Sequence, residues 1–198
     1  MSQSELEENS SRVAARRRHR AAKAGSGFTA PEIMIVLGII LIMLSISLPD
    51  LIRILQNYRT LGDARSIAAE LALARMSAAS NYTRSRVSFN LTANTYQVEL
   101  WSRSSKSYQI EGGVQSLSQG ITFGYGNITT PAGGQTTIAQ TPQFYFNSRG
   151  ISVDSSGNAV GTDAIYVTNN NGLTCAITAS LSGQPEAWKY NGTTWVAF

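Results

Sequence analysis

The sequence predicts an α+β fold in which one long N-terminal helix packs on a C-terminal antiparallel β-sheet head. Three observations predict it: an apolar run at 28–48, helical spacing of apolar residues at 49–80, and short alternating segments at 81–198. The run is typical of a membrane anchor, the spacing of an amphipathic helix, and the alternation of half-buried strands. With a leader at 1–27, we therefore expect four parts: leader, anchor, amphipathic helix and head.

The apolar run Phe28–Leu48 contains a single charged residue, Glu32. Its 21 residues match the roughly 20 that a helix needs to cross the hydrocarbon core of a membrane. A basic cluster, Arg16–Arg20 with Lys23, precedes the run, so we expect the N-terminus to stay in the cytoplasm. A secretory signal peptide is the alternative, but its apolar region is shorter and ends at a small-residue cleavage site, which Pro49–Ile52 does not offer.

Glu32 is the unusual residue of this run, because a carboxylate inside a membrane segment costs about 3 kcal/mol on insertion scales. One interpretation places it near the interface, where water solvates it. The other is that it pairs with a cation from a neighbouring chain. If the chain is cut after Gly27, the new amine of Phe28 would be the natural partner for Glu32 of an adjacent subunit.

The helical pattern continues beyond the membrane run to about Ser80. We expect the stripe Leu55, Leu61, Ile67 and Leu71 to pack on the sheet. The apolar positions with three- and four-residue spacing are Leu51, Ile52, Leu55, Tyr58, Leu61, Ile67, Ala68, Leu71, Ala72 and Met76. The charged positions between them, interpreted as a solvated face, are Arg53, Arg59, Asp63, Arg65, Glu70 and Arg75.

The sequence of the head, residues 81–198, predicts short strands separated by turns. Val87–Leu91 and Tyr96–Trp101 alternate around a Thr-Ala-Asn-Thr turn and predict a hairpin. Further strands are expected at Ile121–Tyr125, Phe144–Phe146, Ala164–Thr168, Leu173–Ser180, Ala187–Tyr190 and Thr194–Ala197. Asn169–Gly172 and Tyr190–Gly192 predict turns, and the polar region Gly112–Pro142 predicts loop around one strand.

Composition narrows the possible functions. Residues 1–27 hold six Lys/Arg against three Glu, and the rest holds ten Lys/Arg against nine Asp/Glu, so the leader supplies +3 of the net charge of +4. The high isoelectric point therefore does not describe a basic nucleic-acid-binding surface. His19 is the only histidine, so residues 28–198 cannot build a histidine-based catalytic or metal site. Cys175, the only cysteine, is expected to be a small buried residue, and Asp154–Asn158 is interpreted as a plain turn rather than a calcium loop. We expect no cofactor and no metal.

The stretch Gly27–Glu32 (G-F-T-A-P-E), followed by Ile33–Val36, resembles the class III signal of type IV pilins and type II secretion pseudopilins. The resemblance implies that a prepilin peptidase cuts between Gly27 and Phe28 on the cytoplasmic face and N-methylates Phe28. It also implies that Glu32 helps the subunit to dock into a growing filament. Pro31 and the length of the leader depart from the usual family pattern.

The head resembles the minor subunits called GspH/FimT-like. The stretches that carry this resemblance are Asp63–Ala79, Phe146–Gly150, Ala164–Thr168, Gly183–Gln184 and Trp188–Tyr190. Ser148 stands where that branch often has proline, and Gln184 where it often has arginine.

The resemblance implies a minor pilin or pseudopilin that initiates or caps a type IV-like filament, for type II protein secretion or for pilus biogenesis. Both systems stay open. The expected partners are the prepilin peptidase, other filament subunits and the inner membrane. The expected location is the inner membrane, with one membrane pass, a cytoplasmic N-terminus and a periplasmic head, and then the filament.

Two alternatives remain at this stage. A FimT-like minor pilin could bind DNA for uptake, and its candidate contacts are Arg84, Arg86, Arg103 and Lys106, although a solvated sheet edge explains these cations equally well. Because residues 28–198 are nearly neutral, we do not expect nucleic acid as a partner. A membrane-anchored exported enzyme is the other alternative, disfavoured by the missing histidine.

Overall fold

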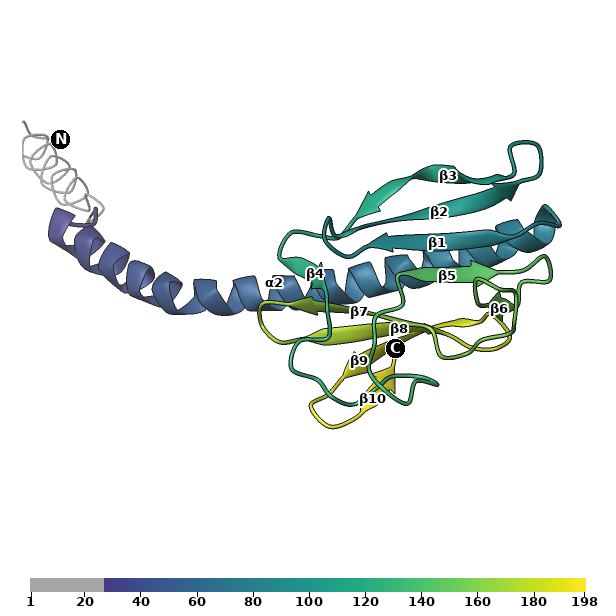
Figure 1. The fold of residues 1–198 in the computed structure, drawn as a ribbon. Coiled ribbons are helices and arrows are strands. Elements are labelled where there is room, and N and C mark those ends of the chain that lie inside the picture. Colours follow the sequence, from purple (N-terminus) through teal and green to yellow (C-terminus); the bar gives the residue numbers. More distant parts are fainter. Residues whose placement is uncertain (1–26) are drawn as a thin grey trace, which may run out of the picture. The chain divides into compact units, whose positions relative to one another are not determined.

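The computed structural model of the protein describes residues 27–198 and confirms the predicted α+β fold (Figure 1). The leader expected at 1–27, with its basic cluster and His19, lies outside the described residues except for Gly27. The helix is α2 (Ala30–Ser80). The strands are β1 (Ser85–Asn90), β2 (Thr95–Ser102), β3 (Ser107–Ser116), β4 (Ile121–Phe123), β5 (Gln143–Phe146), β6 (Ser152–Val153), β7 (Ala164–Asn169), β8 (Thr174–Ala179), β9 (Pro185–Tyr190) and β10 (Trp195–Ala197).

The chain divides into two compact units at the bond between Leu48 and Pro49. In the first unit, residues 30–48 are helical, and every side chain from Pro31 to Leu48 other than Gly38 is exposed. This part of α2 is long and apolar enough to cross a membrane. An exposed apolar surface of this extent marks a site of contact with a membrane or with another protein.

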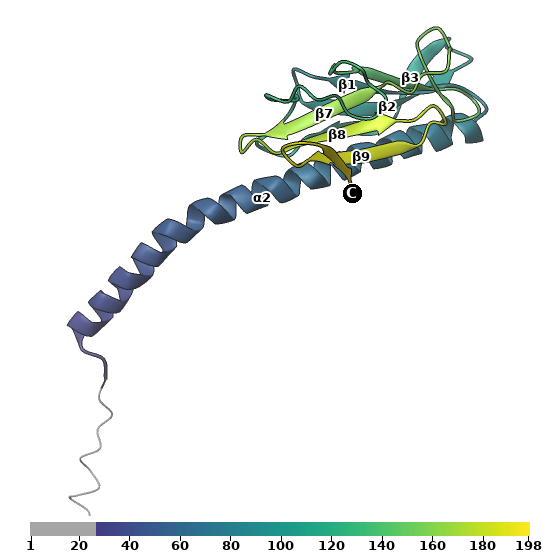
Figure 2. The same cartoon turned by 90° about the horizontal axis from the view of Figure 1, so that it is seen from below.

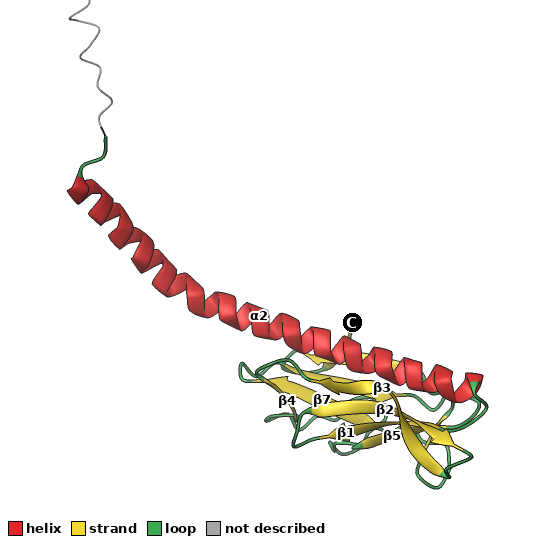
Figure 3. Ribbon diagram, turned by 90° about the horizontal axis from the view of Figure 1, so that it is seen from above, coloured by secondary structure: helices red, strands yellow, loops and turns green. Residues whose placement is uncertain are grey.

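In the second unit, the C-terminal half of α2 lies along two antiparallel sheets (Figures 2 and 3). The first sheet has the strand order β3-β2-β1-β5-β6, and the second has the order β10-β9-β8-β7-β4. One continuous core joins the helix to both sheets. Its fully buried side chains include Ile67 and Leu71 from α2, Val87 from β1, Ile165 from β7 and Ile177 from β8. The helix thus supplies a central part of the core of the head.

The stripe that docks differs from the predicted one. The buried residues of α2 are Thr60, Ala64, Ile67, Leu71, Ala74, Ser77 and Ala78. Leu55, expected in the stripe, is 47% exposed, and Leu61 is only partly buried. Met76, which also follows the helical spacing of the apolar positions, is 60% exposed. Most residues of the docked face are small, so the helix can approach the sheets closely. Apart from Ser77, the buried positions from Thr60 to Ala78 alternate spacings of four and three residues, and positions 55 and 76 do not belong to this series. Buried Thr60 is paired, because its Oγ1 accepts a hydrogen bond from Asn169 Nδ2 at 2.9 Å.

The predicted hairpin is confirmed as β1 and β2, with Val87 opposite Val98 and Phe89 opposite Tyr96. The other expected strands correspond to β4, β5, β7, β8, β9 and β10, within a few residues at each end. Two strands were missed. β3 has the sequence S-Y-Q-I-E-G-G-V-Q-S, in which polar residues and two glycines hide the alternation, because it is an edge strand with largely exposed side chains. β6 has only two residues.

The segment 124–141, expected as loop except for the strand residues 124–125, covers the outer face of the second sheet. All the apolar residues of β7 from Ala164 to Val167 are buried, so this strand has apolar neighbours on both faces. Tyr166 lies on the outer face, where its hydroxyl donates to Gln135 Oε1 at 2.6 Å and accepts from the Ala132 N–H at 3.0 Å. The Gln140 amide pairs with the backbone N–H and C=O of Tyr166 at 2.7 and 2.9 Å, as a neighbouring strand would. Side-chain amides therefore replace a missing strand here.

Candidate functional site

The first turn of α2 contains the residues that the sequence singles out for processing and assembly. Thr29 precedes the first helical residue, and its carbonyl oxygen accepts the first helical hydrogen bond from Ile33 N–H at 3.1 Å. Glu32, three residues after Thr29, turns its Oε2 back to the Thr29 N–H at 3.5 Å. This contact is the carboxylate half of a Thr-x-x-Glu capping box. Pro31 lies in the same turn, where its missing N–H would have no helical partner in any case.

This geometry leaves the Glu32 carboxylate at the mouth of the apolar helix, exposed and without an ion-pair partner among residues 27–198. Among residues 27–198, the ion pairs are Arg53 with Asp50 and Arg86 with Glu99. The carboxylate makes one long hydrogen bond to its own helix, and the helix N-terminus attracts it electrostatically. The second oxygen remains available for a cation that the described residues do not provide.

The peptide bond between Gly27 and Phe28 lies just outside the helix. Phe28 is 75% exposed, and apart from Gly27 and its chain neighbours no atom of the described residues lies within 4 Å of the position that a Cβ atom would take at Gly27. A non-helical, exposed bond is the form in which a peptidase can bind a chain. Cleavage at this bond and N-methylation of Phe28 stay predictions.

The four cations considered for DNA contact have different surroundings. Arg86 pairs with Glu99 at 2.6 Å, and its guanidinium lies 4.2 Å from the centre of the Tyr108 ring. Arg103 donates a hydrogen bond to the backbone oxygen of Tyr82. Lys106 is exposed in the turn between β2 and β3, where its φ of 51° is left-handed.

Arg84 is exposed and, with Arg86, lies close enough to Tyr108 to affect its titration: burial raises the pKa of Tyr108, and both guanidinium charges oppose the rise. The structure thus brings Arg84 and Arg86 together around one aromatic side chain. It assigns Arg86 and Arg103 local contacts within the head. A role of the four residues in DNA contact remains untested.

Two charged residues that were expected on a solvated face of α2 instead join the helix to loops. Asp63 accepts hydrogen bonds from the backbone N–H and the hydroxyl of Ser118, both at 2.8 Å. Arg75 Nε donates to the carbonyl oxygen of Gly150 at 3.1 Å, and its Nη1 donates to Gln184 Oε1 at 3.4 Å. These contacts depend on the tertiary fold, so helical spacing alone could not predict them.

The contacts of Arg75 mark a junction where three of the family-like stretches meet. Gly150 follows β5, and Gly183 lies in the turn between β8 and β9 with φ of 76°. A Cβ atom at Gly183 would lie only 2.0 Å from the carbonyl oxygen of Gly150. Only glycine fits this close approach. The motif residues around Gly150 and Gly183 therefore stabilise the head.

The sequence predictions for Cys175 and for Asp154–Asn158 are confirmed. Cys175 is fully buried, and burial raises the pKa of its thiol to about 12, so it stays protonated. The Asp154 carboxylate accepts hydrogen bonds from Ser156 N–H, Asn158 N–H and Asn158 Nδ2 at 2.9–3.0 Å, which is a plain Asx turn.

Asp163, directly before β7, gives the head a pH dependence. Burial raises the pKa of its carboxyl from 3.8 to about 6, against an opposing hydrogen bond with Thr141. Between these two pKa values the folded head holds a proton that the unfolded chain releases, so stability falls as pH rises through this window. We expect Asp163→Asn to reduce the fall in melting temperature between about pH 4 and pH 6.5. Thermal melts of wild type and variant across this range check it, and parallel pH profiles would contradict it.

The exposed apolar half of α2 followed by a head of antiparallel sheets is a pilin-like α+β fold. No protein-family model matches the chain, and no curated protein sequence matches it. The chain is similar to a solved structure of the minor pseudopilin EpsH from the type 2 secretion system of Vibrio cholerae. That match has 14% identity and a TM-score of 0.47, and it covers 70% of this chain and 97% of that one. A crystal structure of EpsH gives 13% identity and a TM-score of 0.44, covering 66% and 94%. These values are too low to transfer a role or a partner to this chain.

Proposed function

We propose that the chain is a structural, non-catalytic subunit, a minor pilin or pseudopilin that initiates or caps a type IV-like filament for type II secretion or pilus biogenesis. The observation that carries this proposal is the start of α2. There an exposed apolar helix begins with one carboxylate, Glu32, directly after an accessible Gly27–Phe28 bond.

The chemistry of this segment favours a cationic partner. Residues 33–48 are apolar or small and expose their side chains, so lipid must cover them before assembly and neighbouring helices afterwards. A carboxylate at the edge of such an environment is stabilised by a cation that arrives with a neighbour. Cleavage after Gly27 would place an amine on Phe28 of each subunit. The amine of one subunit would then pair with Glu32 of the next.

The proposal includes a place in the cell and a set of partners. Residues 1–27 serve as a cytoplasmic leader that a prepilin peptidase removes, with methylation of Phe28. Residues 28–48 anchor the chain in the inner membrane with the head in the periplasm. Residues 49–80 and 81–198 form the docking helix and the head, and other filament subunits surround them after assembly.

The test is recovery of the mature chain from filaments sheared off intact cells. We expect the chain to cofractionate with the major subunit, and we expect its deletion to reduce filament number strongly because initiation fails. Loss of secreted proteins with unchanged surface pili assigns the chain to secretion, and the opposite pattern assigns it to a pilus. A chain that stays wholly in the membrane fraction, and whose deletion changes neither, would contradict the proposal.

A further inference from the structure

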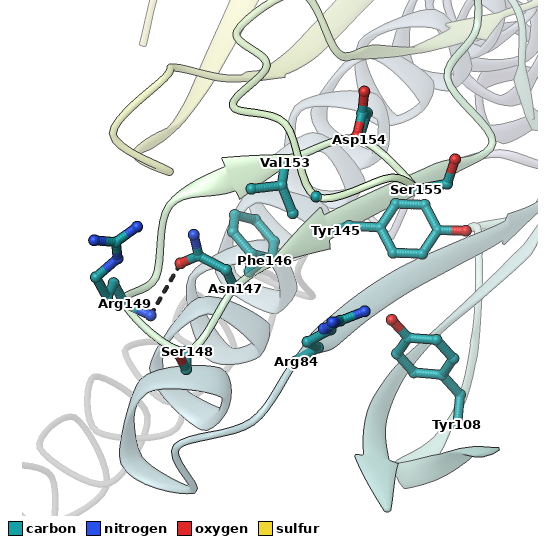
Figure 4. Close-up of a pocket in the computed structure, with 11 residues that line it drawn as sticks. Arg84, Tyr108, Tyr145, Phe146, Asn147, Ser148, Arg149, Val153, Asp154 and Ser155 are labelled. Carbon is teal, nitrogen blue, oxygen red and sulfur yellow. Dashed lines mark hydrogen bonds between the residues drawn. The ribbon is translucent and has the colours of Figure 1, made fainter. Parts of the chain in front are cut away.

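The outer face of the first sheet holds a hollow of about 360 Å³. Its lining includes Arg84, Tyr108 of β3, Tyr145 of β5, and the turn residues Asn147, Arg149 and Asp154 (Figure 4). Its volume is at the lower end of the range for ligand pockets, enough for one or two amino-acid side chains. All of these residues belong to the head. Binding at the hollow can therefore be tested separately from the membrane helix and from the proposed filament role.

One wall of the hollow is a packed aromatic cluster. The Tyr108 ring lies edge-on to Trp101 at 5.1 Å and to Tyr145 at 6.2 Å, measured between ring centres. Arg86 lies over the Tyr108 ring, and Glu99 neutralises its charge. These contacts fix the wall before any ligand binds, so little side-chain freedom would be lost on binding.

Two guanidinium groups in the lining have no carboxylate partner among residues 27–198. Arg84 and Arg149 are exposed and join neither of the ion pairs in this part of the chain. In Figure 4, Arg84 lies between Tyr108 and Arg149, and the Asp154 carboxylate points away from both arginines. The Asp154 carboxylate instead accepts hydrogen bonds from its own turn, and these bonds lower the pKa of its carboxyl.

We propose that this hollow docks a carboxylate-bearing peptide segment of a partner protein. The guanidinium of Arg84 or Arg149 is a planar fork that matches a carboxylate in two parallel hydrogen bonds. Tyr, Trp and Arg together are the residues that dominate the affinity of protein interfaces. Nucleic acid is less favoured, because residues 28–198 carry only ten Lys/Arg against nine Asp/Glu and exert little long-range attraction on a polyanion.

The experiment uses the full chain in lipid nanodiscs and a phage library of randomised peptides. The double variant Arg84→Gln/Arg149→Gln removes both cations, and Lys106→Gln is the matched control, because Lys106 is an exposed cation outside the hollow. We expect the wild type, but not the double variant, to enrich peptides that contain Asp or Glu. The best peptide should lose about tenfold or more in affinity on the double variant, and similarly when its own acidic residue becomes the amide. Lys106→Gln should keep full affinity.

Enrichment of peptides without acidic residues, or equal enrichment by the double variant, would overturn the proposal. A labelled duplex and a single-stranded oligonucleotide are tested in parallel at physiological salt. If they bind through Arg84 and Arg149 while no acidic peptide does, the hollow is a nucleic-acid site instead. Because both arginines are exposed, the variants should keep the wild-type melting temperature, and this is checked first. Failure here leaves filament recovery unaffected, so the two proposals fail separately.

Discussion

Replacing Leu71 with alanine should lower the free energy of unfolding of the head by about 2–5 kcal/mol. Leu71 is fully buried in the core between α2 and the two sheets, where its truncation leaves a cavity. For a domain of about 150 residues, this corresponds to a fall in melting temperature of roughly 5–15 °C. We expect residues 49–198 to fold as a soluble monomer once the anchor is removed, so thermal and urea unfolding of that fragment measure the effect.

Leu73→Ala is the matched control, because Leu73 has the same side chain on the same helix but is 43% exposed. Its truncation should change stability by no more than about 0.5–1 kcal/mol. Arg75 would be a poor control, because its Nε donates a hydrogen bond to Gly150. Similar small losses for Leu71→Ala and Leu73→Ala would mean that the helix does not dock through the face containing Ile67 and Leu71.

Replacing Glu32 with alanine should leave cleavage of the chain intact but remove most of it from filaments. The substitution deletes the carboxylate that would pair with the Phe28 amine of a neighbour, and it also deletes the capping contact to Thr29. The exposed Gly27–Phe28 bond is unchanged, so the peptidase should still cut. Immunoblots of sheared filaments, compared with the membrane fraction, measure incorporation.

Glu32→Gln separates the two roles of the carboxylate. Glutamine can retain the capping contact to the Thr29 N–H but carries no charge. Intermediate incorporation of Glu32→Gln would show that charge pairing and hydrogen bonding both contribute. Wild-type incorporation of Glu32→Ala would show that Glu32 has no docking role.

Much of the fold was predictable, because its strongest signals are local. The length and composition of the apolar run up to Leu48 are enough to predict a long apolar helix. The alternation at Val87–Phe89 and Tyr96–Val98 predicts a hairpin. The docked face of α2 was predicted less well. Large apolar residues such as Leu55 draw attention in a sequence, whereas the helix actually approaches the sheets through small ones such as Ala64 and Ala74.

In the candidate site, too, local contacts have a signal in the sequence, whereas contacts between distant segments do not. The capping contact between Thr29 and Glu32 was not predicted, although the Thr-x-x-Glu spacing signals it in the sequence. The pairing of Arg86 with Glu99 depends on the register of β1 and β2, which places these two residues opposite each other. The hollow of Arg84 and Arg149 gathers segments far apart in the sequence, and only the tertiary fold reveals it.

The measurement that tests the central claim most directly is the intact mass of the full chain extracted from membranes of cells with and without an active prepilin peptidase. The account predicts a mature chain that begins at Phe28 and carries one added methyl group in the first case, and the uncut chain in the second. A mature chain that begins near Asp50 would instead identify the apolar run as a signal peptide. An uncut chain in cells with active peptidase would contradict the filament-subunit account altogether.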